Sequence, residues 1–313
     1  MTATCGIDIG GTKIAGGVVD DDGVLLAEGR TTSPATDGAA LQRAVADLVA
    51  DLGRDHDLAA LGVGAAGYVA ADRSTVLFAP NIAWRDAPLG ADLARLTGLR
   101  VVVENDANAA AWGEFVHGAG RDVQHQLMVT VGTGVGGGII AGGQLLRGGF
   151  GVAAEIGHLR LVPDGERCGC GKRGCLEAYA SGTALVRRAR AAVAAGDPAT
   201  AGVLDRAGGD PASVTGPLLT AAARDGDRFA VDQFTLLGRW LGLGLASLAS
   251  VLDPEVIVVG GGVGAAGDLL LAPAREAFGE HLTGRHHRPE AEIRTAELGG
   301  SAGIIGAADL ARA

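Results

Sequence analysis

The chain has 313 residues, which is long enough for two domains, and its hydrophobic fraction of 48% is sufficient to fill two cores. The formal net charge is −10 and no run of lysine or arginine occurs, which excludes an extended nucleic-acid surface. The sequence has no secretory signal and no uninterrupted apolar stretch of about 20 residues, so we expect a cytoplasmic protein that does not enter the membrane. In that setting the four cysteines favour a metal site over disulfides.

The N-terminal segment predicts three strands followed by a helix. Residues 4–9 and 14–20 are short apolar runs, and an Asp-Asp-Gly turn then leads into a third run at 24–26. Apolar residues recur at helical spacing over 39–52. Farther along, the β-branched runs 61–65 and 101–103 are typical of buried parallel strands, and the alanine-rich segment 106–118 is typical of a helix.

A glycine turn follows the first strand. Gly10 and Gly11 let backbone N–H groups approach an anion closely, and Thr12 and Lys13 add side-chain donors. Asp8, at the end of the strand, is suited to holding a hydrated magnesium ion near phosphates. The spacing of a Walker loop is absent, and a tight hairpin explains the same glycines, so the turn alone is a weak signal.

Asp106 follows the strand at 101–103 and begins a helix. A carboxylate there either caps the helix or accepts a proton from a substrate hydroxyl, holding the oxygen in line for attack on a phosphate. Position alone leaves both interpretations open. Asn81 and the turn at 64–67, which ends in Gly67, come next in interest, although such residues are common in ordinary loops.

A second strand-rich unit follows the first. The run 127–131 leads into a turn made of Gly132, Thr133 and Gly134, of the same kind as the first turn, and then into 139–140. Two strand–hairpin–helix units that each open on a glycine turn predict a duplicated α/β architecture with a cleft between the halves.

The C-terminal part predicts several helices between residues 182 and 252, of which 236–252 is interpreted as a buried core helix, while 196–217 is the most loop-like stretch. A buried strand at 256–259 then precedes Gly261 and Gly262. The adenosine of a nucleotide fits beside these glycines, and a simple strand-to-helix turn explains them nearly as well. The segment 302–311 predicts a terminal helix.

The strongest signal lies between residues 155 and 177. Three of the four cysteines fall within eight positions, with a histidine ten residues upstream of the first. Thiolates and one imidazole form a good tetrahedral zinc site, whereas a disulfide across Cys-Gly-Cys would be strained. Three reduced thiols in a glycine-rich loop are the remaining alternative. The predicted ligands are His158, Cys168, Cys170 and Cys175. Glu155 and Glu177 flank the site and remain free to bind a hydroxyl-rich molecule.

Together these motifs resemble the ROK family of sugar kinases, and within it the bacterial glucokinase branch. The resemblance spans nearly the whole chain. It is carried by the segments 8–13 (DIGGTK), 104–108 (ENDAN), 132–138 (GTGVGGG), 155–158 (EIGH) and 168–177 (CGCGKRGCLE). The cysteine segment together with Glu-x-Gly-His is highly specific, whereas the glycine turns alone are not.

The resemblance implies an α/β chain of two ribonuclease-H-like domains, of the actin/hexokinase type, that flank a cleft and close over ATP and sugar. A small N-terminal domain would cover 1–110 and be completed by a C-terminal helix at about 301–313. A large domain carrying the zinc loop would cover 111–300. The resemblance also implies a homo-oligomer, either a dimer or a tetramer.

The same resemblance assigns roles to single residues. Asp106 would take the proton from the 6-hydroxyl of the sugar. The other hydroxyls would be bound by Gly67, Asn81, Asn105, Glu155, His158 and Glu177. The phosphates would lie against Gly10, Gly11, Thr12, Lys13, Gly132, Thr133 and Gly134, with Gly261 and Gly262 near the adenosine. Zinc would be structural, and Mg²⁺ would accompany ATP near Asp8.

The implied activity is transfer of the ATP γ-phosphate to glucose, giving glucose 6-phosphate and ADP for glycolysis. A kinase for N-acetylmannosamine, mannose or fructose is the nearest alternative, because two or three pocket residues are enough to shift sugar selectivity. A ROK repressor core is a second alternative, disfavoured because the phosphate turn begins at Asp8 and leaves no room for a preceding helix-turn-helix. A non-catalytic sugar-binding module is the third.

Overall fold

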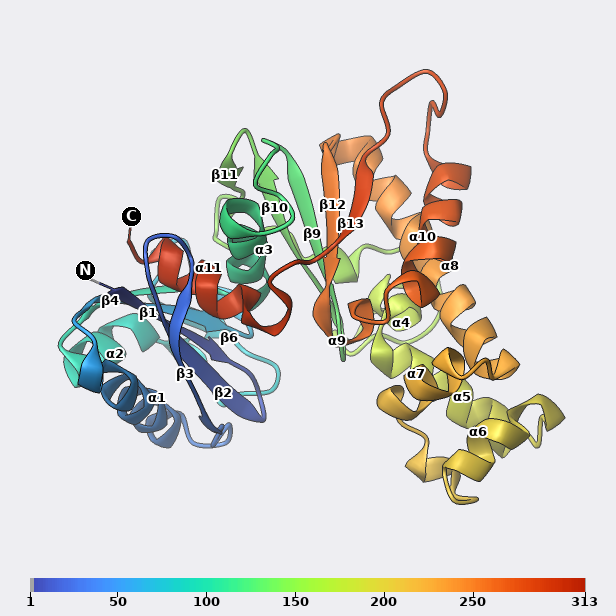
Figure 1. The fold of residues 1–313 in the computed structure, drawn as a ribbon, viewed down its shortest axis with the longest axis horizontal. Helices are drawn as coiled ribbons and strands as arrows, with labels where there is room; N and C mark the ends of the chain where they lie inside the picture. The colour runs from blue at the N-terminus through green and yellow to red at the C-terminus, as the bar shows by residue number, and fades with distance from the viewer. Residues whose placement is uncertain (1–2, 313) are drawn as a thin grey trace. The chain divides into compact units, whose positions relative to one another are not determined.

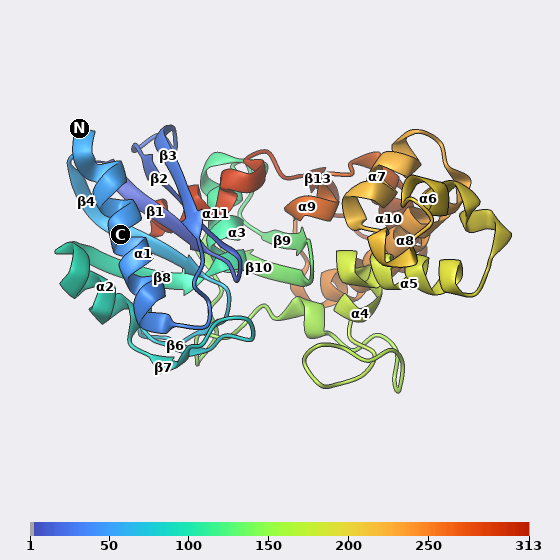
Figure 2. The same cartoon turned by 90° about the horizontal axis from the view of Figure 1, so that it is seen from below.

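A computed structural model describes residues 3–312, which form an α/β protein, as predicted (Figures 1 and 2). The described chain divides into two compact units. The first contains the residues up to Met128, the segment Gly137–Ala154 and the chain from Ala296 onward, and the second contains Val129–Gly136 and Glu155–Thr295. The domains predicted from the sequence (1–110 with 301–313, and 111–300) have other limits, and they stay a prediction.

The first sheet lies in the first unit and has the strand order β3-β2-β1-β4-β8. Its strands are β1 (Ala3–Ile9), β2 (Lys13–Val19), β3 (Leu25–Thr32), β4 (Leu58–Ala65) and β8 (Arg100–Asn105). β1, β2 and β3 are antiparallel neighbours, whereas β4 runs parallel to both β1 and β8. In the pairing register Ile9 lies opposite Ala65, and Ala65 lies opposite Asn105. The C-terminal ends of β1, β4 and β8 therefore lie side by side along one edge of the sheet.

Helices cover both faces of this sheet, as Figure 1 shows. They are α1 (Gly38–Leu52), continued by the 3₁₀ turn η1 (Gly53–Asp55), α2 (Leu89–Thr97), α3 (Asp106–His117) and α11 (Ala302–Leu310), which follows the turn η5 (Gly299–Ser301). The predicted apolar stripe of α1 is buried against the sheet, from Leu41 to Leu52. Burial of this stripe removes apolar surface from water, which is the main stabilising contribution to the unit.

The C-terminal helix α11 packs directly on β1 and β4. This close approach requires glycine in the sheet, because a Cβ atom on Gly6 would collide with the carbonyl oxygen of Ile304. A Cβ atom on Gly62 would likewise collide with the carbonyl oxygen of Ala307. The last helix is therefore an integral layer of the unit that contains the first strand.

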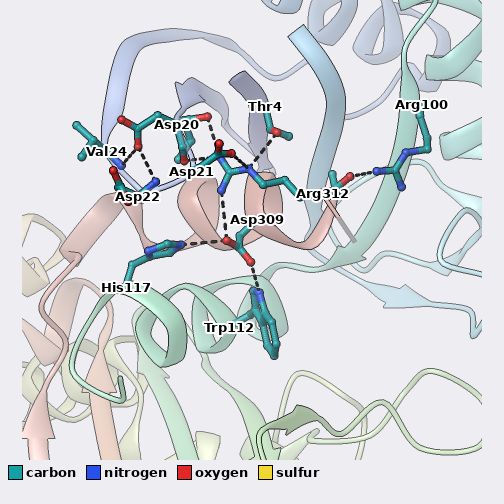
Figure 3. A network of polar contacts seen from close by, with 12 residues as sticks. Thr4, Asp20, Asp21, Asp22, Val24, Arg100, Trp112, His117, Asp309 and Arg312 are labelled. Carbon is teal, nitrogen blue, oxygen red and sulfur yellow. Dashed lines mark hydrogen bonds and ion pairs between the residues drawn. The ribbon is translucent and has the colours of Figure 1, made fainter. Parts of the chain in front are cut away.

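Polar contacts fix the end of α11 in place (Figure 3). The Asp309 carboxylate accepts a hydrogen bond of 2.8 Å from the Trp112 indole and lies 3.0 Å from Nε2 of His117. Arg312 donates to the Val19 carbonyl at 2.8 Å. These contacts connect the C-terminal helix to both α3 and β2.

The second sheet has the order β11-β10-β9-β12-β13, and a small antiparallel sheet has the order β5-β6-β7. The strands of the second sheet are β9 (Gln126–Val131), β10 (Val135–Ala141), β11 (Gln144–Leu145), β12 (Val256–Gly260) and β13 (Glu292–Thr295). Those of the small sheet are β5 (Tyr68–Val69), β6 (Val76–Phe78) and β7 (Arg85–Ala87). The predicted strands at 127–131, 139–140 and 256–259 are confirmed.

The second unit is mainly helical. Its helices are α4 (Glu177–Ala180), α5 (Gly182–Ala194), α6 (Ala201–Arg206), α7 (Gly216–Arg224), α8 (Arg228–Leu252), α9 (Gly261–Gly264) and α10 (Asp268–His281), with 3₁₀ turns η2 (Ile156–His158), η3 (Pro198–Thr200) and η4 (Pro211–Ser213). The expectation of a loop over 196–217 was therefore wrong, because α6 and two 3₁₀ turns lie there. Asp197 and Asp210 cap the two turns, a local signal that apolar periodicity does not detect.

The helix α8 is long and apolar enough to cross a membrane by length and composition alone. It packs against α10, α7, α4 and α5, and its buried face includes Phe234, Leu237 and Leu241. The prediction of a buried core helix is confirmed, and such a helix passes the length test in soluble proteins as well.

Candidate active site and metal centre

Asp106 begins α3 at the edge where β8 ends. The helix cap is its neighbour Asn105, whose side-chain oxygen accepts from the Asn108 amide at 3.0 Å, so Asp106 is not the cap. The side-chain nitrogen Nδ2 of Asn105 donates to the Gly67 carbonyl oxygen at 3.1 Å and to Oδ1 of Asp106 at 3.1 Å. The structure thus brings together three of the predicted site residues, with the carboxylate held by its own backbone turn and by Asn105.

Glu104 supports this turn from inside the unit. Its side chain is only 3% exposed, and Oε2 accepts from Nε of Arg147 at 2.7 Å. Oε1 accepts from the side chain of Asn108 and from the amide of Asn105, both at 3.1 Å. The sequence motif included Glu104, but nothing in the sequence pointed to Arg147, which lies far away along the chain.

The glycine turn after β1 is a tight hairpin, in which Gly10 donates to the Lys13 carbonyl at 3.0 Å. A Cβ atom on Gly11 would lie 3.2 Å from Cβ of Asn81, so the turn and the Asn81 loop are neighbours. Burial raises the pKa of the Asp8 carboxyl, and the positive charge of Lys13 opposes that rise. An oxygen ligand of this kind at the end of β1 suits a hydrated magnesium ion.

The predicted zinc ligands converge on one point in the second unit. The candidate ligand atoms of His158, Cys168, Cys170 and Cys175 all lie within 4.8 Å of one another. The sulfurs of Cys170 and Cys175 are 3.7 Å apart, and Nδ1 of His158 is 3.7 Å from the Cys168 sulfur. Zn–S bonds of about 2.3 Å at a tetrahedral angle place two sulfurs about 3.8 Å apart. The donor set therefore fits a closed four-ligand zinc site.

Two carboxylates adjoin this centre. Nε2 of His158 lies 3.9 Å from Oε2 of Glu155, so one ring nitrogen faces the thiols and the other faces a glutamate. Burial raises the pKa of Glu155. The Glu177 carboxylate accepts from the Val135 amide at 3.1 Å, and a Cβ atom on Gly134 would collide with it. Gly134 therefore makes room for a glutamate here.

A cavity of about 940 Å³ lies within the second unit. Gly132, Thr133 and Gly262 line it, so the second and third glycine turns share one pocket, as the nucleotide prediction requires. Gly261 does not line the cavity but supports it. Its φ is +85° and an added Cβ would lie 2.5 Å from the Val131 carbonyl oxygen, so only glycine fits.

The opposite walls of the cavity were not predicted. They come from α5 and α7 and include Leu185, Arg187, Thr220 and Arg224. These helices carry an ordinary amphipathic pattern, and nothing in their sequence distinguishes a residue that faces a cavity from one that faces solvent.

Three comparisons with known proteins bear on these sites. The model of the ROK family matches residues 4–313. A glucokinase of Streptomyces coelicolor is 51% identical over 313 residues, covering 100% of this chain and 98% of that protein. A crystal structure of a ROK family glucokinase from Streptomyces griseus, in complex with glucose and AMPPNP, superposes with a TM-score of 0.91 at 52% identity and 99% coverage of both chains. For a ROK hexokinase from Thermus thermophilus the TM-score is 0.82, at 37% identity and 99% and 98% coverage.

The match runs through the whole described chain, including both glycine turns and the loop 155–177, which carries the four candidate metal ligands. It confirms the resemblance read from the motifs and the actin/hexokinase-type fold that the resemblance implied. The chain belongs to the ROK family.

Proposed function

We propose that this protein is an ATP-dependent glucokinase, which transfers the γ-phosphate of ATP to the 6-hydroxyl of glucose. The observation that carries the proposal is the fixed position of Asp106, whose carboxylate Asn105 holds beside the Gly67 carbonyl at the sheet edge. The similarity to glucokinases over the full chain supports the same activity.

The chemistry needs one proton acceptor. The 6-hydroxyl oxygen attacks the γ-phosphorus, the bond from that phosphorus to the bridging oxygen breaks, and ADP leaves. The hydroxyl proton passes to Asp106 late in the reaction, because the transition state of phosphoryl transfer is loose. Catalysis then depends mainly on alignment and on stabilisation of the spread phosphoryl charge.

The cavity lined by Gly132, Thr133 and Gly262 is proposed to hold the nucleotide, with adenosine towards the Gly262 side. The turn from Gly10 to Lys13, together with Gly134, is proposed to contact the phosphates. Backbone N–H groups in such glycine turns form concave anion sites. Asp8 would hold a hydrated Mg²⁺ ion, which would neutralise part of the phosphate charge.

The sugar hydroxyls are proposed to bind Gly67, Asn81, Asn105, Glu155, His158 and Glu177. Carboxylates accept two hydroxyl hydrogen bonds each, which fixes the orientation of the ring. His158 would serve the sugar with Nε2 and the metal with Nδ1. Zinc, held by His158 and the three cysteines, supplies rigidity to this wall when bound, because four protein ligands leave no position for a catalytic water.

The remaining expectations are also proposals. A glucokinase acts in the cytoplasm at the start of glycolysis, and we place this protein there. We further propose that the two domains close over ATP and sugar during turnover. Closure excludes water, which competes with the sugar for the phosphoryl group. The proposed assembly is a homo-oligomer, either a dimer or a tetramer.

The test is a coupled assay of ADP release with Mg·ATP and a panel of hexoses. Glucose should have the highest kcat/KM. A clear preference for N-acetylmannosamine, mannose or fructose would replace the substrate while keeping the reaction. Absence of turnover on every hexose, with zinc present, would move the protein to the class of sugar sensors.

A further inference from the structure

A second cavity, of about 390 Å³, opens beside the metal loop and has no part in the proposed reaction. The charged residues in its wall are Arg160, Asp164, Arg167, Lys172 and Arg173. Four of these five carry a positive charge. Such a concentration is unusual in this chain, whose formal net charge is −10. The cavity is therefore a local basic site on an acidic protein.

The four cations have no carboxylate partner within residues 3–312, although ion pairs are common elsewhere on this surface. Arg173 donates to the carbonyl oxygen of Gly165 at 3.0 Å. Glu166 does not line the cavity, and its carboxylate lies 3.6 Å from Arg187. Asp164 is the single acidic side chain in the cavity wall, so the four positive charges are at most partly neutralised there.

Backbone pairing brings two of these positive side chains close together. Arg167 and Arg173 lie directly opposite each other in an antiparallel bridge, which places their side chains on the same face. The turn between them is closed by the Cys168 amide, which donates to the Lys172 carbonyl at 2.9 Å. Like charges directly opposite in such a pair are destabilising. An anion between them would remove that cost.

The candidate metal centre does not remove this repulsion between like charges. Three thiolates with one bound Zn²⁺ would carry a net charge of −1. Asp164 adds a second negative charge, against four positive side chains. Bound zinc would hold the loop rigid, because Cys168 belongs both to the candidate ligand set and to the cavity wall. A rigid cavity with excess positive charge is suited to a multiply charged anion.

We propose that this cavity is a second, non-catalytic binding site for a phosphate group. Guanidinium groups bind phosphate oxygens through two parallel hydrogen bonds, and three of the four cations here are arginines. The phosphate would come either from free phosphate or from a phosphate monoester such as a sugar phosphate. The site shares no residue with Asp106 or with the nucleotide cavity, so it does not depend on the proposed function.

Isothermal titration calorimetry on the zinc-loaded protein tests the site. Inorganic phosphate, pyrophosphate and glucose 6-phosphate are titrated separately into protein saturated with glucose and AMPPNP, so that nucleotide and sugar sites are occupied. Heat with inorganic phosphate or pyrophosphate identifies a site for free phosphates, and heat with glucose 6-phosphate alone identifies a site for monoesters. A prior titration with glucose reports separately on the proposed function.

The test variant is Arg167→Gln combined with Lys172→Gln. The matched control is Arg54→Gln with Arg95→Gln, which removes the same charge from exposed helix positions. Loss of two charged partners should weaken phosphate binding by roughly tenfold or more, while the control keeps wild-type affinity. Zinc content and melting temperature verify the fold, and Arg160→Gln with Arg173→Gln replaces the first pair if zinc is lost.

Equal phosphate affinity in wild type and in both cavity variants would overturn the proposal, and so would absence of heat with all three anions. A change in sedimentation coefficient of the cavity variants, without a change in phosphate affinity, would also overturn it. That result would assign the basic cavity to a contact between copies of the chain.

Discussion

Nε of Arg147 lies 2.7 Å from Oε2 of Glu104, a residue 43 positions earlier in the chain. Glu104 is almost fully buried, whereas Arg147 is 27% exposed. The same glutamate accepts hydrogen bonds from Asn105 and Asn108. The ion pair therefore contacts the turn that carries Asp106.

Breaking this pair should destabilise the protein. In Arg147→Met the Glu104 charge stays buried without its partner. We expect a loss of about 2–3 kcal/mol, below the range for a fully buried pair because Arg147 is partly exposed. Urea denaturation measures the loss. The double variant Glu104→Gln with Arg147→Met should regain part of it, and equal losses in single and double variants would show that the charge is not the cause.

Asp106→Asn tests the proton acceptor. Asparagine keeps the size and the contact with Asn105 but cannot take a proton. We expect kcat to fall by about 10²–10⁴-fold, with glucose affinity largely kept. The measurement pairs steady-state kinetics with calorimetric glucose binding. Asp47→Asn on the exposed side of α1 is the control and should retain full activity. Wild-type turnover in Asp106→Asn would rule out the assigned role.

Cys170→Ser tests the metal centre. Loss of one thiolate should release zinc, loosen the loop around His158 and raise the KM for glucose more than it lowers kcat. Metal content by mass spectrometry and kinetics on the same sample provide the comparison. Cys5→Ala, at a cysteine in β1 far from the ligand set in the chain, should keep its zinc. Unchanged zinc content and KM in Cys170→Ser would contradict the assignment.

Asp8 connects stability to pH. Burial raises its pKa above the ordinary value of 3.8. A carboxyl whose pKa is higher in the folded state binds protons more tightly when folded, so its charge costs stability at neutral pH. That cost disappears as the pH falls through the folded-state pKa. Asp8→Asn should therefore raise Tm at about pH 7, by an amount that shrinks towards about pH 4.

Calorimetric scans across this range test the linkage, with Asp47→Asn as the exposed control. The same Asp8→Asn variant should lose activity, because the proposed magnesium ligand is gone. A lower Tm at neutral pH would mean that the attraction between Asp8 and Lys13 outweighs the cost of burial.

Gly62→Ala tests the packing of α11. The added methyl group collides with the Ala307 carbonyl, which is backbone and cannot move aside cheaply. Overpacking of this kind costs about 1–3 kcal/mol or more. Gly149→Ala, where an added Cβ meets nothing within 4 Å, should leave the free energy of unfolding nearly unchanged. Equal stability of the two variants would show that α11 shifts to accommodate the added methyl group at little cost.

Local patterns predicted the long buried strands, because strands such as β4 and β12 are compact apolar runs, whereas the short strands β11 and β13 were missed. The same patterns also predicted that His158, Cys168, Cys170 and Cys175 come together, since the spacing of these residues is a local property of the sequence. The small sheet of β5, β6 and β7 was missed. Its strands have two or three residues and depend on packing around buried side chains such as Trp84. Arg147 was missed for the related reason that its partner is distant in sequence.

The docking of α11 against β1 sets an order of events during synthesis. The strand made first lacks one of its covering layers until the last helix has left the ribosome. The segment Glu155–Thr295 is complete before that moment and can form its own core, since domains generally fold as units while the chain emerges. Until α11 docks, the face of the first sheet that carries Gly6 and Gly62 stays open to solvent. Deletion of α11 would leave the face of β1 and β4 that carries Gly6 and Gly62 without its covering helix.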